Sequence, residues 1–245
     1  MKSVSARICS NVHLTEDILR MELETEIASE VACGQFVQVQ VPGFFLRRPI
    51  SVSEVTAENR LVLIYRTVGG GTEALAGMRE GEVLDVFGPL GNGFPLLESD
   101  VVLVGGGVGI PPLVETAKRY VKRGHQVTAV LGYASKEQMF ALEAFEKAGV
   151  QVIAATMDGS AGTKGTVMDA IREHHVSPDL PVLACGPKGM LGAVCGYFPH
   201  GYISMEERMA CGIGACMGCV VRTPEGGSLR VCRDGPVFEI GKVVL

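Results

Sequence analysis

The chain has 245 residues, of which 47% are hydrophobic and 32 are glycine, and its formal net charge is -5. This length can bury the cores of two domains with a small appendage, and the apolar content excludes a disordered chain. The negative charge gives no basic surface for nucleic acid, and no apolar run is long enough to span a membrane. Residues 1–7 carry no apolar leader. We therefore expect a soluble, cytoplasmic protein whose eight cysteines are metal ligands and buried thiols.

Residues 1–98 predict a small antiparallel β-barrel. Alternating or apolar runs at 36–41, 61–66 and 82–87 are separated by Gly and Pro, which is typical of strands joined by tight turns. A short helix is expected at 72–78.

Two motifs in this barrel suggest a phosphate-bearing cofactor. One is Arg47-Arg48-Pro49-Ile50-Ser51 and the other is Val68-Gly69-Gly70-Gly71-Thr72. An arginine beside a hydroxyl can hold a pyrophosphate, and a glycine turn entering a helix presents N–H donors. The alternative is a surface arginine and an ordinary glycine turn.

Residues 99–198 predict a parallel sheet with crossover helices. Strands are expected at 101–104, 126–131, 151–155 and 181–184, and helices are expected after the glycine loop to about 122, at 137–148, at 167–174 and from about 190 to 198. The loop Gly105-Gly106-Gly107-Val108-Gly109 resembles a dinucleotide-binding turn, although Ile110 stands where a last glycine is usual. It could also be only a tight strand-to-helix turn. Cys185-Gly186-Pro187 ends the last strand, so both turns should face one crevice.

Residues 199–245 contain a cysteine pattern of spacing C-x4-C-x2-C-x12-C. Its members are Cys211, Cys216, Cys219 and Cys232. Three thiolates from one glycine-rich loop and a fourth from a distant element are typical of a plant-type [2Fe–2S] cluster. Zinc sites usually pair two C-x2-C knuckles, and disulfides need an oxidising compartment. We therefore predict a one-electron centre. A lobe as small as residues 199–245 needs its metal to fold.

Motifs along nearly the whole chain make it similar to the ferredoxin reductase superfamily. More narrowly, it resembles the family of electron-transfer subunits of type B dihydroorotate dehydrogenases. The motifs are Leu46–Ser51, Ile64–Arg66, Gly71-Thr72, Gly88–Phe94, Val104–Pro112, Asp158–Ser160, Cys185–Pro187, Glu207–Cys216 and Cys232–Phe238.

The resemblance implies three cofactors: FAD, NAD and the [2Fe–2S] cluster. FAD would contact Arg48, Pro49, Ile50, Ser51, Ile64, Tyr65, Arg66, Gly71 and Thr72. NAD(H) would lie over Gly105, Gly106, Gly107 and Gly109, with its nicotinamide near Cys185, Gly186 and Pro187. The four cysteines from 211 to 232 would hold the cluster.

The chain departs from its wider superfamily at two points. Many ferredoxin reductases have Tyr where Ile50 stands, so flavin stacking is either missing or supplied by Tyr65. No Arg or Lys cluster follows 127–131 to hold a ribose 2′-phosphate, which favours NAD over NADP.

The resemblance also implies a partner. An FMN-containing subunit would oxidise dihydroorotate in pyrimidine biosynthesis, and electrons would run through the cluster and FAD to NAD+ in a heterotetramer with two subunits of each kind. Such a conduit needs no catalytic nucleophile or base. The alternatives are a related flavin and iron–sulfur subunit of another oxidoreductase, or a non-catalytic binding module stabilised by zinc.

Overall fold

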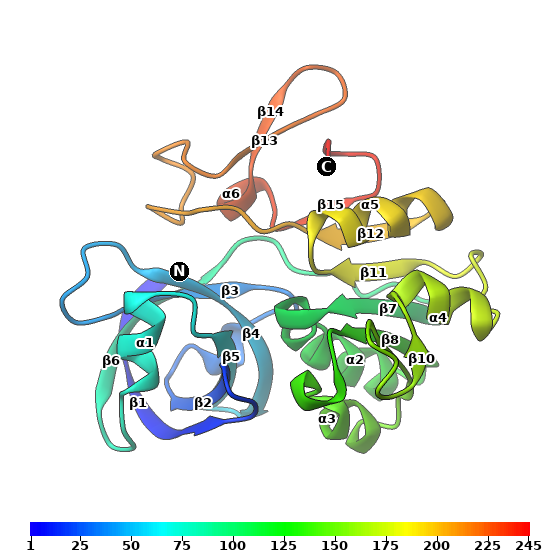
Figure 1. Cartoon of the computed structure of the whole chain (residues 1–245). Helices are drawn as coiled ribbons and strands as arrows, with labels where there is room; N and C mark the ends of the chain where they lie inside the picture. Colours follow the sequence, from blue (N-terminus) through cyan, green and yellow to red (C-terminus); the bar gives the residue numbers. More distant parts are fainter.

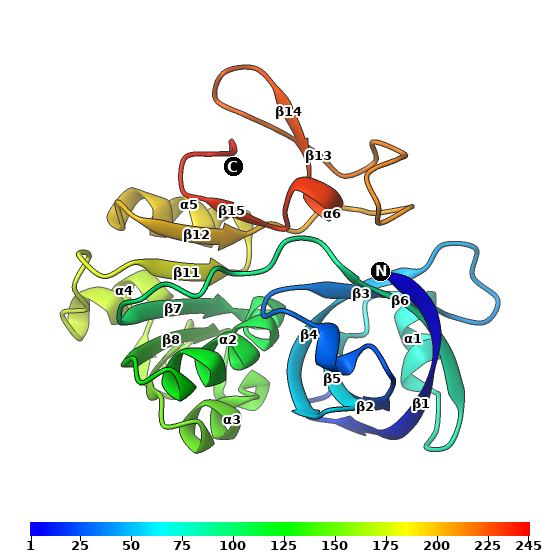
Figure 2. The ribbon, with the colours of Figure 1, turned by 180° about the vertical axis from the view of Figure 1, so that it is seen from behind.

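The computed structural model describes all residues from Met1 to Leu245. A barrel and an α/β domain lie side by side, and the C-terminal segment lies above both (Figure 1). Seen from behind, the connection from the barrel to the α/β sheet passes between them beneath this C-terminal segment (Figure 2). No helix is long and apolar enough to cross a membrane.

The predicted antiparallel barrel is present and closed. Its strands run in the order β1-β2-β5-β4-β3-β6. They are β1 (Lys2–His13), β2 (Ile18–Glu24), β3 (Phe36–Gln40), β4 (Arg48–Ala57), β5 (Arg60–Arg66) and β6 (Val83–Leu90), with the 3-10 turn η1 (Ala28–Glu30) and helix α1 (Gly70–Ala76) between them. Alternate side chains such as Leu61, Leu63 and Val52 fill the interior, because successive side chains in a strand point to opposite faces.

The second part is a seven-stranded sheet in the order β10-β9-β8-β7-β11-β12-β15. Its strands are β7 (Val101–Gly106), β8 (Val127–Tyr133), β9 (Gln151–Thr156), β10 (Thr163–Lys164), β11 (Val182–Cys185), β12 (Gly201–Ser204) and β15 (Val237–Glu239). The helices are α2 (Pro111–Lys122), α3 (Leu142–Lys147), α4 (Val167–Glu173) and α5 (Lys188–Tyr197), with 3-10 turns η2 (Gly107–Gly109) and η3 (Lys136–Gln138). All neighbouring strands are parallel except β15, which runs antiparallel to β12.

Two expectations differ from the structure. The single helix predicted at 137–148 is wrong: η3 and α3 are separated near Ala141, which has a left-handed φ of 64°. In addition, β12 and β15 come from residues 199–245 yet extend the main sheet. The sheet itself continues past residue 198. The domain boundaries predicted at residues 98 and 198 therefore remain a proposal for which part of the chain holds which cofactor.

The C-terminal segment packs closely on both other parts. It contains the hairpin β13 (Val220–Arg222) and β14 (Ser228–Arg230) and the short helix α6 (Val231–Asp234). Gln38 on β3 donates from Nε2 to the Ala210 carbonyl at 3.3 Å. Asn92 donates from Nδ2 to the carbonyls of Arg233 and Asp234, both at 3.1 Å.

A charged cluster on α2 fastens the barrel to the α/β domain. The Glu115 carboxylate is only 7% exposed and accepts from the Val55 N–H at 3.0 Å and from Arg119 Nε at 2.7 Å. Arg119 also donates to the Val31 carbonyl at 2.7 Å, and Lys118 donates to the Val55 carbonyl at 3.2 Å. These bonds satisfy backbone groups of the barrel with side chains of the neighbouring domain, so the two parts are held in one orientation.

Replacement of Glu115 tests this fastening. Glu115→Ala leaves Arg119 Nε and the Val55 N–H without their acceptor in a buried place, so we expect the free energy of unfolding to fall by about 3 kcal/mol in urea denaturation. Glu143→Ala is the matched control, because Glu143 pairs only with Lys147 on the exposed face of α3. Equal effects of the two substitutions would contradict the account.

Candidate functional site

The cysteine loop between 211 and 219 has no regular helix or strand. Gly212, Gly214 and Met217 have positive φ angles of 70°, 80° and 59°. A Cβ on Gly212 would lie 2.7 Å from Gln38 Nε2, and one on Gly214 would lie 2.7 Å from the Arg233 side chain. The loop thus needs glycine both for its left-handed turns and for close packing.

The four cysteine thiols are arranged as two pairs. The Sγ atoms of Cys219 and Cys232 are 3.2 Å apart and buried, which is too long for a disulfide. Nearer the surface, Cys216 lies beside Cys211, whose Sγ accepts from the Cys216 N–H at 3.4 Å. No three His, Cys, Asp or Glu side chains converge on a single ion. A tetrahedral zinc ion takes all four ligands at once, whereas a binuclear cluster takes two per iron, so the arrangement fits [2Fe–2S].

Backbone N–H groups point at these sulfur atoms. Gly214 donates to Cys232 Sγ at 3.1 Å, Ala215 to Cys211 Sγ at 3.3 Å, and Cys232 to Cys219 Sγ at 3.4 Å. Burial opposes the Cys211 thiolate, but donors from the loop outweigh it and lower the pKa of Cys211 to about 6. Burial and the nearby Cys219 sulfur raise the pKa of Cys232. Iron binding must displace this proton, while the N–H groups stabilise the negative charge of the bound cluster.

The predicted FAD residues fall into two groups. Arg48 at the start of β4 meets α1: a Cβ on Gly71 would overlap its guanidinium, which also lies 4.8 Å from the centre of the Phe44 ring. The Thr72 hydroxyl accepts from the N–H groups of Val68 and Gly69 at 2.9 and 3.3 Å, which shapes the glycine turn. Arginine, glycine turn and hydroxyl are therefore together, as a pyrophosphate site requires.

The other predicted FAD residues lie along β4 and β5. Pro49 is exposed and Ser51 half-buried, whereas Ile50 is in the barrel core and Ile64 packs with the α/β domain. Tyr65 is also buried in the barrel and donates its hydroxyl to Asn11 Oδ1 at 3.0 Å; burial raises its pKa to about 12. Because the Tyr65 side chain lies inside the barrel, the alternative in which aromatic stacking on the flavin is missing stays as the prediction.

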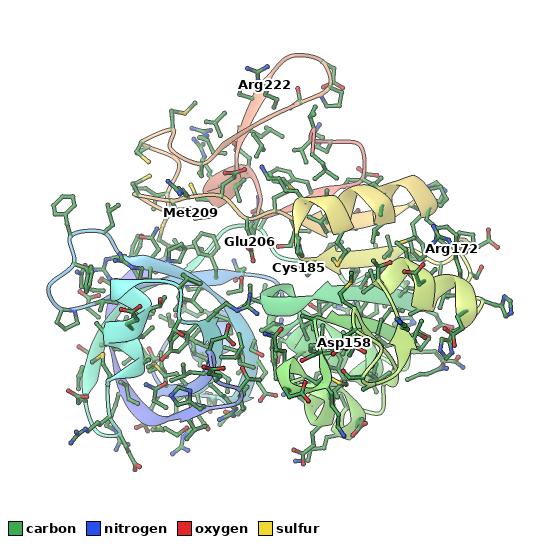
Figure 3. All side chains as sticks on the ribbon, in the orientation of Figure 1. Asp158, Arg172, Cys185, Glu206, Met209 and Arg222 are labelled. Atoms are coloured by element: carbon green, nitrogen blue, oxygen red, sulfur yellow. The ribbon has the colours of Figure 1, made fainter.

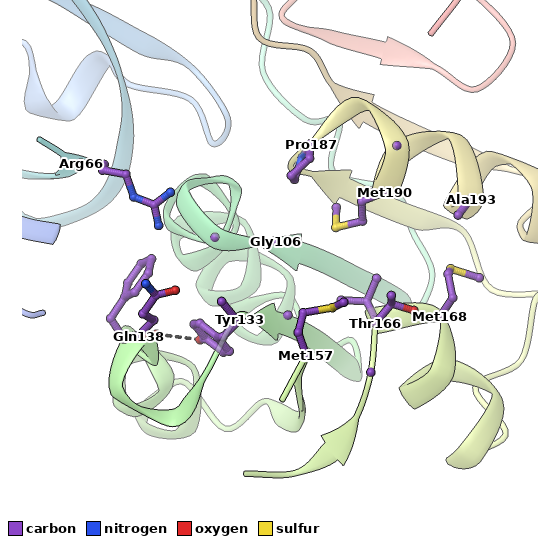
Figure 4. A pocket seen from close by; sticks show the side chains of 17 residues that line it. Arg66, Gly106, Tyr133, Gln138, Met157, Thr166, Met168, Pro187, Met190 and Ala193 are labelled. Atoms are coloured by element: carbon purple, nitrogen blue, oxygen red, sulfur yellow. Dashed lines mark hydrogen bonds between the residues drawn. The ribbon is translucent and has the colours of Figure 1, made fainter. Parts of the chain in front are cut away.

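A cavity of about 420 Å³ opens at the carboxyl ends of β7, β8 and β9 and beside the turn after β11. Because β8 and β11 flank β7, the chain reverses its strand order here, which is where open α/β sheets bind ligands. Figure 4 shows Arg66 reaching towards this cavity from the barrel, opposite Gly106 and Pro187. Arg66 is paired with Asp17 through Nε and Oδ2 at 3.0 Å. Gly107 also lines the cavity.

The two predicted NAD turns lie directly against each other. A Cβ on Gly109 would overlap the Cys185 carbonyl, and one on Gly106 would lie 2.7 Å from Met190 Sδ and 3.2 Å from Pro187. The open side of Gly105 is filled by Ile110, whose Cγ1 would lie 2.8 Å from a Cβ added to this glycine. The missing last glycine of the motif is thus replaced by an isoleucine that packs under the strand.

Cys185 and Glu206 stand where the three parts meet (Figure 3). Solvent still reaches the Glu206 side chain, but protein surrounds it on most sides, and this partial burial raises the pKa of its carboxyl. Burial and the neighbouring Glu206 raise the pKa of the Cys185 thiol. Cys185 is therefore a neutral thiol at physiological pH and not a thiolate nucleophile.

Several contributors were missed by the sequence reasoning. Tyr133, Met157, Thr166 and Met190 line the cavity. Tyr133 ends β8 and Met157 follows β9 at the ligand-binding edge, which was the available signal, whereas Thr166 is the N-cap of α4 and Met190 lies on α5. Gln38 and Asn92 support the cluster segment from far away in sequence, and no local pattern marks them.

Two family models match separate parts of the chain. The family model for the iron-sulfur cluster binding domain of dihydroorotate dehydrogenase B matches residues 206–244, and the oxidoreductase NAD-binding domain matches residues 103–196. A dihydroorotate dehydrogenase B (NAD(+)) electron transfer subunit from Geobacillus sp. (strain WCH70) is 46% identical over 100% of both chains. The chain belongs to this family. The Bacillus cereus (strain B4264) member is 41% identical, again over 100% of both chains.

Solved structures share the fold of this chain. A chain of an NADH-dependent reduced ferredoxin-NADP oxidoreductase, studied for flavin-based electron bifurcation, has a TM-score of 0.88 at 30% identity and covers 98% of this chain and 89% of its own. A ferredoxin NADP+ reductase from Neisseria gonorrhoeae with bound FAD and NADP has a TM-score of 0.66 at 16% identity, with 86% and 96% coverage. The latter supports the fold alone. The predicted family, fold class, iron–sulfur centre and NAD-binding domain are confirmed.

Gly71→Ala tests the proposed flavin cradle. The new methyl group displaces the flexible end of Arg48 without touching the barrel core, so we expect normal stability and an FAD dissociation constant raised about tenfold, from loss of charge-assisted hydrogen bonds. Gly77→Ala is the control, because Gly77 has helical φ and no atom within 3.4 Å of an added Cβ. Fluorescence titration of the apoprotein with FAD measures both, and an unchanged constant for Gly71→Ala would exclude this cradle.

Proposed function

We propose that this chain takes electrons from an FMN-containing subunit that oxidises dihydroorotate and delivers them to NAD+ in pyrimidine biosynthesis. The observation that carries the proposal is that the barrel borders both other cofactor sites. It contributes Arg66 to the cavity of the NAD-binding domain, and it contributes Leu46 and Arg47 to a hollow that also includes Cys211. A flavin on the barrel would therefore lie between the cluster and NAD.

Each cofactor would supply a different kind of electron transfer. Bound NAD exchanges a hydride, a [2Fe–2S] centre exchanges single electrons, and a flavin can do both. The protein's residues position and tune these groups. Arg48 and the Gly71 turn would hold the FAD pyrophosphate, the glycine loop from 105 to 109 would hold NAD, and the N–H donors of the cysteine loop would stabilise the cluster. Cys185 stays protonated and uncharged beside the flavin and nicotinamide.

The surface around the cluster loop supports docking of the partner there. Cys216 is exposed. Large apolar side chains of the cluster loop and of the β3–β4 loop, which projects on the same side (Figures 1 and 2), are also exposed: Phe45 by 97%, Met217 by 54%, Ile213 by 44% and Leu46 by 43%. Apolar patches of this kind mark interfaces between proteins. The proposed assembly is a cytoplasmic heterotetramer with two subunits of each kind.

A second candidate is a related subunit that serves another oxidoreductase. The TM-score of 0.88 to the chain from the NADH-dependent reduced ferredoxin-NADP oxidoreductase favours it. Identity is 30% in that case and 46% to the dihydroorotate dehydrogenase B relative, so the first function is the better supported. Identification of the subunit that co-purifies with the chain distinguishes them.

Cys219→Ser tests the route in the assembled complex. The substitution breaks the buried thiol pair, so we expect loss of NAD+ reduction by dihydroorotate, while dihydroorotate oxidation by an artificial dye continues on the partner. Cys195→Ser is the control, because Cys195 lies on α5 outside the two pairs. Loss of both activities in Cys219→Ser would contradict a separate substrate subunit.

A further inference from the structure

We propose that Arg230 is a positioning residue that raises the reduction potential of the cluster. It does so by holding and polarising the backbone whose N–H groups donate to the cysteine sulfur atoms. Arg230 is not one of the predicted ligands, and the cysteine spacing gives no indication of it. The inference rests on the proposed role of the four cysteines from 211 to 232 as the cluster ligands.

Gly214 lies at the point of the cysteine loop from which hydrogen bonds reach both thiol pairs. Its own N–H donates to Cys232 Sγ at 3.1 Å, and the N–H of the next residue, Ala215, donates to Cys211 Sγ at 3.3 Å. The left-handed φ of Gly214, 80°, lets these two successive N–H groups face the sulfur atoms. One short piece of backbone therefore stabilises negative charge on one sulfur of each pair.

The Arg230 guanidinium holds the other side of this backbone. Its Nη1 donates to the Gly214 carbonyl at 3.0 Å. That carbonyl and the Ala215 N–H belong to the same trans peptide unit, in which they point in opposite directions. Arg230 thus begins a chain of hydrogen bonds that ends on Cys211 Sγ. Its positive charge polarises the peptide between them, which makes the N–H a stronger donor to the sulfur.

Arg230 is itself fixed and partly shielded from water. Its backbone N–H and its Nε both donate to Asp234 Oδ2, at 2.8 and 3.2 Å, and its side chain is 25% exposed. Solvent screens such a charge less than a fully exposed one, so it acts more strongly on its neighbours. Arg233 also packs on Gly214, but with its aliphatic carbons: a Cβ on Gly214 would lie 2.7 Å from Arg233 Cδ.

Reduction of a [2Fe–2S] cluster adds one electron and therefore one negative charge, and no covalent bond of the protein forms or breaks. In the proposed route this electron comes from the FMN-containing partner and passes on to the flavin. Hydrogen bonds to the sulfur atoms and nearby positive charge stabilise the reduced form more than the oxidised form, so both raise the potential. The Asp234 carboxylate opposes part of the Arg230 charge. The two side chains should therefore shift the potential in opposite directions.

Arg230→Gln removes the charge and the donor to the Gly214 carbonyl. A redox titration of the assembled complex, followed by the electron paramagnetic resonance signal of the reduced cluster, measures the potential without turnover. We expect the ratio of reduced to oxidised cluster at a fixed ambient potential to fall about tenfold, equivalent to about 59 mV, because a charge-assisted hydrogen bond is lost. Arg230→Lys keeps the charge and should recover most of the potential. Asp234→Asn keeps an acceptor for Arg230 and should raise it.

Arg222→Gln is the matched control. Arg222 is exposed on β13 of the same hairpin (Figure 3), so the chain loses the same charge while the contacts of Gly214 are kept. The potential should remain that of the wild type.

The assignment of Arg230 and the assignment of the cluster fail in different ways. An equal shift in Arg222→Gln, or an unchanged potential in Arg230→Gln, would overturn the role of Arg230 alone. If Arg230→Gln does not assemble a cluster, Asp234→Asn decides, and an unchanged or lowered potential in that variant would overturn the role as well. A wild type without acid-labile sulfide and without a resonance signal on reduction would overturn the proposed cluster, and the inference with it.

Discussion

The pairing of β15 with β12 fixes the cluster segment on the nucleotide-binding sheet. Val237 lies opposite Ser204 and Phe238 opposite Ile203, which ties the end of α6, with the proposed cluster ligand Cys232, to the main sheet. The segment has no core of its own: Cys219 and Cys232 belong to the same apolar cluster as Val102. The sheet that carries the NAD cavity therefore also sets the position of the buried thiol pair.

The barrel is held against this combined unit at two places. Gln38 and Asn92 bind the cluster segment, and Glu115 with Arg119 fastens the side of the barrel to α2. Electron transfer needs carriers at fixed separations, and these contacts hold the three parts of the chain in one orientation. Gly212 lets the cysteine loop pack on Gln38 of the barrel, and Gly109 lets the glycine loop pack on the turn after β11 within the α/β domain.

The sequence predicts the site better where local chemistry and spacing are distinctive. The spacing of Cys211, Cys216, Cys219 and Cys232 and the strand–glycine–helix order reveal the fold class and the two confirmed cofactor regions. Local sequence patterns do not predict features that depend on the rest of the fold. Residues 137–148 look helical throughout, but the turn at Ala141 interrupts the helix. The sequence leaves open whether Tyr65 supplies flavin stacking, because strand polarity alone does not say which face of β5 is inside. The addition of β15 to the sheet has no sequence signal, since it is only 3 residues long.

The central claim is that one rigid chain links the cluster, a flavin and NAD. An absorption spectrum of the chain, co-expressed with its partner and kept anaerobic, tests it most directly when recorded before and after addition of NADH. The account predicts flavin bands together with broad cluster absorption, both bleached by NADH. Flavin bands without cluster absorption, accompanied by stoichiometric zinc, or cluster bands that stay unchanged while the flavin is bleached, would contradict it.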